Sequence, residues 1–164
     1  DADLIIASDG LSDPFVGTDL AAQGFGCEVY VEVPAFAGAE LSTLRASWAF
    51  RIIENFAMNV AEWGGISRQL TKYGVLSTEF PMAGVLPDHM LLDGSAGFLV
   101  GMPVTGRAPR VEMPFGAIDV VALTLLTPNE LAQIRRDHEA GRAAVVAARA
   151  AVAAGHACRI DLGD

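Results

Sequence analysis

The side chains of this 164-residue chain that could carry out chemistry are three histidines, two cysteines and several closely spaced carboxylates. Two histidines four residues apart on one helix face would suit zinc. His89, His138 and His156 lie far apart and form no H-x-x-x-H pattern. Because a lone histidine is usually a structural residue, we predict no metal site.

The carboxylates and glycines also fail to form a familiar reaction site. Glu28 and Glu32 resemble a glycosidase pair, yet four residues of one strand separate them by about 13 Å, which exceeds the usual carboxylate separation. Gly24-Phe25-Gly26 lacks the third glycine of a nucleotide-binding loop and leads into a strand. The aspartates near the N-terminus lack the spacing and central glycine of a calcium loop; they are Asp1, Asp3, Asp9, Asp13 and Asp19. We therefore predict no catalytic residues, no cofactor and a protein that is not an enzyme.

Charge and composition narrow the class of partner. The formal net charge is -9, with 20 acidic and 11 basic side chains, which disfavours nucleic acid and anionic membranes. An acidic chain suits a basic protein partner, although acidity also serves solubility alone. The two cysteines form no disulfide framework, no signal peptide opens the chain, and no apolar run reaches the ~18–20 residues of a membrane span. We expect a cytoplasmic protein.

The elements that position these residues are organised around one apolar run. Between residues 117 and 126 only two side chains are polar, which predicts a central strand buried on both faces. Thr127, Pro128 and Glu130 then have the types and spacing of a helix cap, first turn and capping box. A helix is therefore predicted from Pro128, with a bend or break at Gly141 and an alanine-rich stretch beyond it.

Residues 27–33 show the clearest strand alternation. The apolar set, expected to face the core, is Cys27, Val29, Val31 and Val33. The opposite set is Glu28, Tyr30 and Glu32, which would form an acidic face open to solvent or to a partner. The preceding residues 11–24 are rich in turn formers and predict a long surface loop that carries Asp13.

The remaining pattern predicts one helix and several short strands. The helix extends from about Glu40 to Trp63 and ends at Gly64-Gly65. The short strands are expected at residues 4–7, 89–92, 98–100, 110–113 and 159–162, with a hairpin turn at Asp93-Gly94. The sequence therefore predicts a single α/β domain of the α+β type over residues 1–164, in which a mixed central β-sheet of about five or six strands is flanked by helices.

Several short motifs resemble the N-terminal domain of the Suppressor of fused family, in a bacterial member. They are Gly10-Leu11-Ser12-Asp13, Gly24-Phe25-Gly26 with Glu28, His89-Met90-Leu91-Leu92, Pro114-Phe115-Gly116, and Thr127 with Glu130-Leu131. Their order and spacing carry the resemblance, since each motif is weak alone. We expect Phe115 to anchor the strand entry in the core and Gly116 to allow a tight turn or close packing.

The resemblance implies a mixed α/β domain that binds another protein and does not catalyse a reaction. In animals the family member sequesters transcription factors and grips an extended peptide as an added strand. Bacterial members look like immunity proteins that neutralise toxins. We therefore expect a partner that is a basic toxin domain or an extended peptide, bound by Asp13 and by the face of Glu28, Tyr30 and Glu32.

Two alternatives remain open on sequence alone. The first is a hydrolase whose site is assembled from Asp88, His89 and Asp93, although no G-x-S-x-G motif frames a serine. The second is a structural domain of a larger protein.

Overall fold

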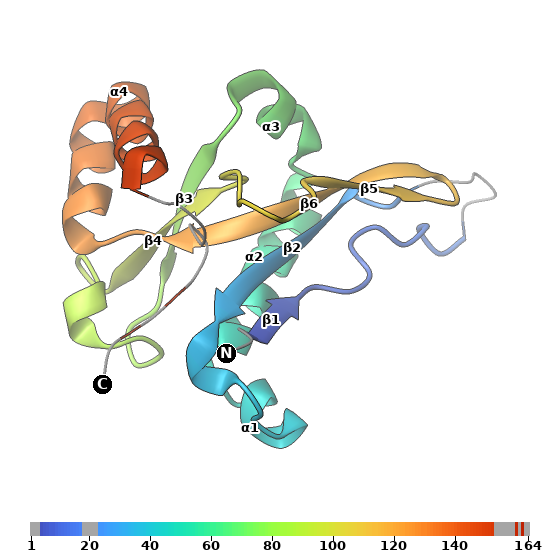
Figure 1. Ribbon diagram of the computed structural model, residues 1–164, viewed down its shortest axis with the longest axis horizontal. Helices are drawn as coiled ribbons and strands as arrows, with labels where there is room; N and C mark the ends of the chain where they lie inside the picture. The colour runs from blue at the N-terminus through green and yellow to red at the C-terminus, as the bar shows by residue number, and fades with distance from the viewer. Residues whose placement is uncertain (1–3, 18–22, 153–159, 161, 163–164) are drawn as a thin grey trace.

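A computed structural model describes residues 4–17, 23–152, 160 and 162 of the chain (Figure 1). This part of the chain contains six strands and four helices. The strands are β1 (Leu4–Ala7), β2 (Cys27–Val33), β3 (Leu76–Pro81), β4 (Ser95–Val100), β5 (Arg110–Met113) and β6 (Gly116–Leu125). The helices are α1 (Leu41–Arg45), α2 (Trp48–Trp63), α3 (Ser67–Tyr73) and α4 (Pro128–Val152), with 3-10 turns η1 (Pro34–Phe36) and η2 (Asp88–Met90). The strands form one mixed sheet, so the expected α+β architecture is confirmed.

β6 is the central strand of the sheet, whose order is β1-β2-β6-β4-β3. It runs parallel to β2 and antiparallel to both β4 and β5. Every residue from Val121 to Leu126 is buried, as the apolar run predicted. The first residues of β6, which pair with β5, are only partly buried apart from Ile118.

β4 and β5 pair one after the other with the same edge of β6, so together they occupy the place of one interrupted strand. Val100 pairs with Leu123, and Arg110 pairs with Asp119. Between these two pairs the chain advances by ten residues from Val100 to Arg110, but only four residues of β6 lie along the same distance. The chain here has six residues more than a continuous strand would need, and residues 102–108 leave the sheet as a loop, which we call the 102–108 loop.

Helices cover both faces of the sheet, and the 102–108 loop completes the second face. α2 packs on the face where the apolar set of β2 points, so the core side of β2 is confirmed (Figure 1). α4 packs on the opposite face, where Leu131 joins Leu99 of β4 in a second cluster. Beside this cluster, Val104 of the 102–108 loop packs with Tyr30 and Ala122.

The single helix expected from about Glu40 to Trp63 is two helices. Ser47 separates them, because its hydroxyl accepts a hydrogen bond from Phe50 N at 3.2 Å and donates one to Leu44 O at 2.6 Å. A serine that bonds nearby backbone in this way starts a new helix more readily than it continues an old one. Gly64, with φ +73°, ends α2 as predicted.

α4 begins at the residue that the sequence predicted, but its break lies elsewhere. Thr127 N and Oγ1 donate to the Glu130 carboxylate at 2.7 and 3.0 Å, which confirms the capping box. The break lies at His138, with φ +51° and ψ -120°, and not at Gly141. Gly141 instead allows the two halves of α4 to approach, because a Cβ there would lie 2.6 Å from Gln133 O.

The stretch from residue 65 to residue 94 departs most from expectation. α3 and β3 both lie in it and were not foreseen. The strand expected at residues 89–92 is wrong, since Pro87 and Asp88 favour the turn η2, and β4 pairs with β3 instead. The Asp93-Gly94 hairpin turn is confirmed: both residues have positive φ, and Leu92 and Ser95 exchange hydrogen bonds of 2.9 and 3.0 Å across it.

The last expected strand, at residues 159–162, lies partly outside the described residues. Ile160 and Leu162 are described, and neither belongs to a strand. Ile160 is buried in the core, and its N–H donates to Glu32 O at 2.8 Å, which ties this residue to β2.

Candidate functional site

Glu28 lies inside a hydrogen-bonded loop. Its Oε1 accepts hydrogen bonds from Ser12 N at 2.8 Å, Ser12 Oγ at 2.7 Å and Gly10 N at 3.2 Å. Its Oε2 accepts one from Ser8 Oγ at 2.5 Å. The carboxylate therefore organises the loop that follows β1, and the exposed Asp13 lies on that loop.

The prediction of an open acidic face on β2 is wrong. The exposed fraction is 0% for Glu32 and 5% for Tyr30. Arg107 of the 102–108 loop reaches across the sheet, with Nε 2.7 Å from Glu32 Oε1. The alternation along β2 is right, but the 102–108 loop covers its second face. A cavity of about 280 Å³ remains there, lined mostly by apolar side chains together with Glu28 and Tyr30.

Two of the motifs that carry the family resemblance lie side by side. Phe25 N donates to Leu11 O at 2.6 Å and joins residues 24–26 to residues 10–12. Gly24 has φ +52°, and a Cβ there would lie 2.3 Å from Asp13 O, so a larger residue would force the loop to move. Gly24 therefore has a structural role in this loop.

Phe115 does not anchor the core, contrary to expectation. It lies at the tip of the β5–β6 hairpin, where a short connection turns the chain in solvent, and 55% of it is exposed. Pro114 is exposed as well. Gly116 has φ +119°, and a Cβ there would clash with Gln23, whose Nε2 donates to Phe115 O at 2.9 Å. The close packing expected at Gly116 is therefore confirmed.

The residues of the hydrolase alternative do not form a preorganised group. Asp88, His89 and Asp93 are all exposed. The Asp93 carboxylate is 2.8 Å from Arg135, and in the described part of the chain no hydrogen bond joins His89 to either aspartate.

Cys27 is a poor nucleophile in this environment. Burial, aided by the nearby carboxylates of Glu28 and Asp119, raises the pKa of Cys27 to about 12, so its thiol stays protonated at neutral pH. Among the described residues no group of three or more His, Cys, Asp or Glu side chains is placed to hold a metal ion.

The outer side of β3 is a free edge of the described sheet. β3 pairs with β4 along all of Leu76–Pro81 and ends the strand order. Met82 N donates to Gly94 O at 2.9 Å in this ladder. Because paired and unpaired positions alternate in an antiparallel ladder, the backbone groups of Ser77 and Glu79 point away from β4. Within the described ranges these groups bond to no other element.

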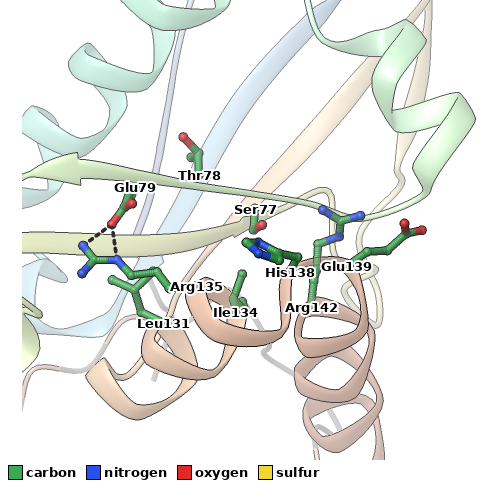
Figure 2. A pocket seen from close by; sticks show the side chains of 9 residues that line it. All are labelled: Ser77, Thr78, Glu79, Leu131, Ile134, Arg135, His138, Glu139 and Arg142. Carbon is green, nitrogen blue, oxygen red and sulfur yellow. Dashed lines mark hydrogen bonds and ion pairs between the residues drawn. The ribbon is translucent and has the colours of Figure 1, made fainter.

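A cavity lies on each side of this edge. The α4 cavity, of about 550 Å³, lies between β3 and α4, and its lining includes Ser77, Glu79, Leu131, Arg135, His138 and Arg142 (Figure 2). The aromatic cavity, of about 460 Å³, lies toward α2 and α3, and its lining includes Trp63, Ile66, Tyr73 and Leu76. Ser77, Glu139 and Arg142 line both, so the two cavities meet at the edge of β3.

Two arginines of α4 differ in their partners. Arg135 donates to Glu79 from Nη2 at 2.6 Å and from Nε at 3.1 Å (Figure 2). It also donates to Asp93 from Nη1 at 2.8 Å. The hydrogen bond to Glu79, together with Asp93, raises the pKa of Arg135 above its ordinary value. Arg142, in contrast, is partly buried and forms no ion pair with any described residue.

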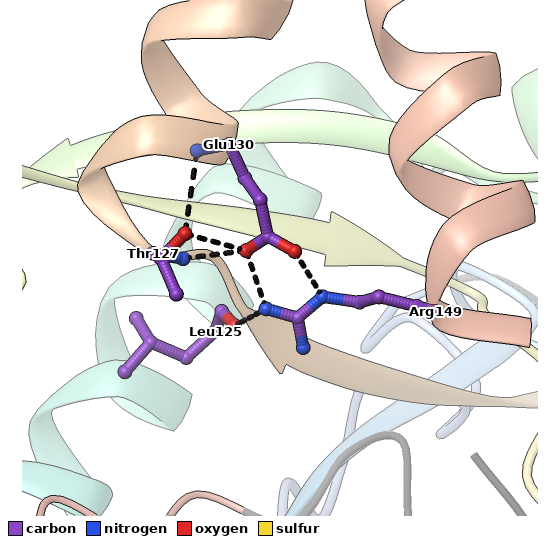
Figure 3. Close-up of polar contacts among 4 residues, drawn as sticks. All are labelled: Leu125, Thr127, Glu130 and Arg149. Atoms are coloured by element: carbon purple, nitrogen blue, oxygen red, sulfur yellow. Dashed lines mark hydrogen bonds and ion pairs between the residues drawn. The ribbon is translucent and has the colours of Figure 1, made fainter. Parts of the chain in front are cut away.

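Glu130 holds the α4 wall of the cavity in place. Its two carboxylate oxygens accept hydrogen bonds from Arg149 Nε and Nη2 at 2.8 and 2.6 Å, and Nη2 also donates to Leu125 O at 2.9 Å (Figure 3). Burial alone would raise the pKa of Glu130, but the hydrogen bonds from Arg149 and Thr127 outweigh it and lower the pKa. The ionised pair joins the second half of α4 to the end of β6, and this fixes the segment that carries Arg142.

This site was not predicted because β3 itself was not predicted. A signal was present, since Leu76, Thr78 and Phe80 alternate along one face of the strand. Three such positions, separated by small or polar residues and ended by Pro81, are a weak pattern beside the long apolar run of β6.

No helix within the described ranges combines the length and apolarity that a bilayer crossing requires. Comparisons with protein-family models, with curated protein sequences and with solved structures give no match to this chain.

Proposed function

We propose that this chain is a non-enzymatic protein-binding domain that captures an extended segment of a partner protein at the edge of β3. The observation that carries the proposal is the position of this edge, where outward backbone groups of Ser77 and Glu79 lie between two cavities. An extended segment beside β3 would form main-chain hydrogen bonds, and its alternate side chains would enter the cavities. The hydrogen bonds supply affinity and the cavities supply specificity.

The other two edges of the described sheet fit this role less well. β1 and β5 contain four residues each, against six in β3. β5 also lies between Pro109 and Pro114 and carries the charged Arg110 and Glu112. Short length, flanking prolines and charges are the features with which proteins protect an edge against added strands.

Charge and resemblance support a choice of partner. A net charge of -9 favours rapid association with a basic protein. The resemblance to the Suppressor of fused family supports binding rather than catalysis and, for a bacterial member, an immunity role. In that role the chain would neutralise a toxin in the cytoplasm by occupying an extended segment of it.

A display library of random octapeptides, selected on the immobilised protein, tests the proposal. Ser77→Pro removes an outward N–H at an edge, where proline is tolerated, and Ser77→Ala is the matched control that keeps it. We expect the selected peptides to lose about tenfold or more in affinity for Ser77→Pro and to bind Ser77→Ala like the original protein. Circular dichroism and thermal unfolding should show that both variants are folded.

Two results would contradict the proposal. One is a set of selected peptides that binds Ser77→Pro as tightly as the original protein, which would place the binding site elsewhere. The other is a failure of the library to yield any peptide with micromolar affinity. Amide hydrogen exchange offers an independent check, because bound peptide should slow exchange at Ser77 and Glu79.

A further inference from the structure

Successive side chains of β3 point to opposite faces of the sheet. Leu76 pairs with Val100 and shares its face toward α2, whereas Ser77 pairs with Leu99 and shares its face toward α4. Side chains of an added strand would alternate in the same way. The residue opposite Leu76 would therefore enter the aromatic cavity, and its neighbour opposite Ser77 would enter the α4 cavity.

The aromatic cavity suits a large apolar side chain. Among its lining residues, Trp63 and Tyr73 are each 49% exposed, and Ile66 is 2% exposed. Exposed aromatic groups around a hollow are typical of binding surfaces, because they provide apolar area at little cost in side-chain freedom.

Arg142 determines which kind of side chain suits the α4 cavity. It is partly buried, lines both cavities and forms no ion pair with any described residue. Arg135 is already engaged by Glu79 and Asp93. Glu139 also lines both cavities, but it is exposed and water can solvate its charge. A partly buried arginine gains more from a partner than an exposed one does, and the planar donors of its guanidinium match a carboxylate.

We infer that the segment captured at β3 presents one acidic side chain to Arg142 and, directly adjacent in its sequence, one large apolar side chain to Trp63 and Tyr73. This inference rests on the proposed function and adds a sequence preference to it. In a segment antiparallel to β3 the acidic residue precedes the apolar one, and in a parallel segment it follows. Because the domain carries a net charge of -9, the rest of the segment is neutral or basic.

An array of fluorescein-labelled octapeptides tests this preference. The flanking residues are Lys, Thr and Val, and the two central positions carry every pair of amino acids. Affinities are measured by fluorescence anisotropy for the original protein, for Arg142→Gln and for Glu139→Gln. We expect Asp or Glu beside Phe, Trp, Leu or Met to bind best, and replacement of the acid by its amide to weaken binding about tenfold. Arg142→Gln should abolish this difference, whereas Glu139→Gln should retain it.

The outcomes separate the preference from the capture itself. If peptides bind, and lose affinity for Ser77→Pro, while acid and amide bind equally, the acidic preference is overturned and capture at β3 stands. If Trp63→Ala and Tyr73→Ala leave the ranking of apolar residues unchanged, the apolar half is overturned. If no peptide binds, or if Ser77→Pro binds as well as the original protein, capture at β3 fails and the preference fails with it.

Discussion

Glu130 and Arg149 join the two halves of α4 across the break at His138. Both carboxylate oxygens of Glu130 are within 2.8 Å of the Arg149 guanidinium, although the two residues are 19 positions apart in the sequence. The same carboxylate accepts hydrogen bonds from Thr127, so one side chain caps the helix and holds its second half.

The first prediction concerns the pH dependence of this contact. Glu130→Gln should lower the free energy of unfolding at pH 7 by about 1–2 kcal/mol, since it loses a charge-assisted pair and weakens the cap. The pKa of Glu130 is lowered in the folded state from its ordinary 4.5, so its stabilisation is complete above pH 4.5 and is lost as the pH falls through the lower folded value. Urea unfolding from pH 7 down to pH 3 should show the two proteins converge at acid pH. A constant difference across this range would contradict the assignment.

A second prediction concerns Gly141. Replacing glycine by alanine inside a helix normally stabilises by about 1 kcal/mol. Here the added Cβ would meet Gln133 O at 2.6 Å, so we expect Gly141→Ala to destabilise by about 1–3 kcal/mol. Ala143→Gly, at an exposed position in the same half of α4, should also destabilise, by about 1 kcal/mol, through propensity alone. Thermal unfolding that shows Gly141→Ala to be more stable than the original protein would mean that the two halves do not pack closely.

Charge reversal on β2 gives a third prediction. Glu32 is fully buried beside Arg107, and Glu32→Lys should destabilise by about 3–5 kcal/mol because it buries a lysine charge that has no counter-ion and lies next to Arg107. Glu40→Lys reverses an exposed carboxylate and should change stability by less than about 0.5 kcal/mol. Chemical denaturation distinguishes the two, and equal effects would show that Glu32 is accessible to solvent.

The fourth prediction contrasts two phenylalanines. Phe115 is 55% exposed at a hairpin tip, so Phe115→Ala should cost less than about 1 kcal/mol. Phe98 is fully buried in β4, and Phe98→Ala should cost about 3–5 kcal/mol. If Phe115→Ala proves as destabilising as Phe98→Ala, Phe115 packs in the core in solution.

Local patterns in the sequence predicted those parts of the fold that local interactions determine. The apolar run of β6, the capping box of Thr127 and Glu130, and the turn at Asp93-Gly94 each depend on neighbouring residues, and each is confirmed. The helix breaks were harder to locate, because Ser47 and His138 interrupt helices at points where the apolar spacing continues or where a glycine lies nearby.

The errors at the candidate sites have a common physical cause. Alternation shows which side chains share a face, but it does not show what covers that face. Tyr30 and Glu32 are buried because the 102–108 loop, far away in the sequence, folds over them. The two cavities beside β3 could not be foreseen for the same reason, since they form only where α4 and α3 meet the strand.

The 102–108 loop interrupts β4 and β5, which would otherwise form one continuous strand beside β6. It makes the chain six residues longer than that continuous strand would be, and six is an even number. Because side chains alternate with a period of two, every residue of β5 keeps the face it would have without the loop. The segment is therefore modular: it can be shortened by an even number or exchanged without reversing the inside and outside of the hairpin. The requirement on any replacement is chemical, since it has to supply a cation for the buried carboxylate that Arg107 now neutralises.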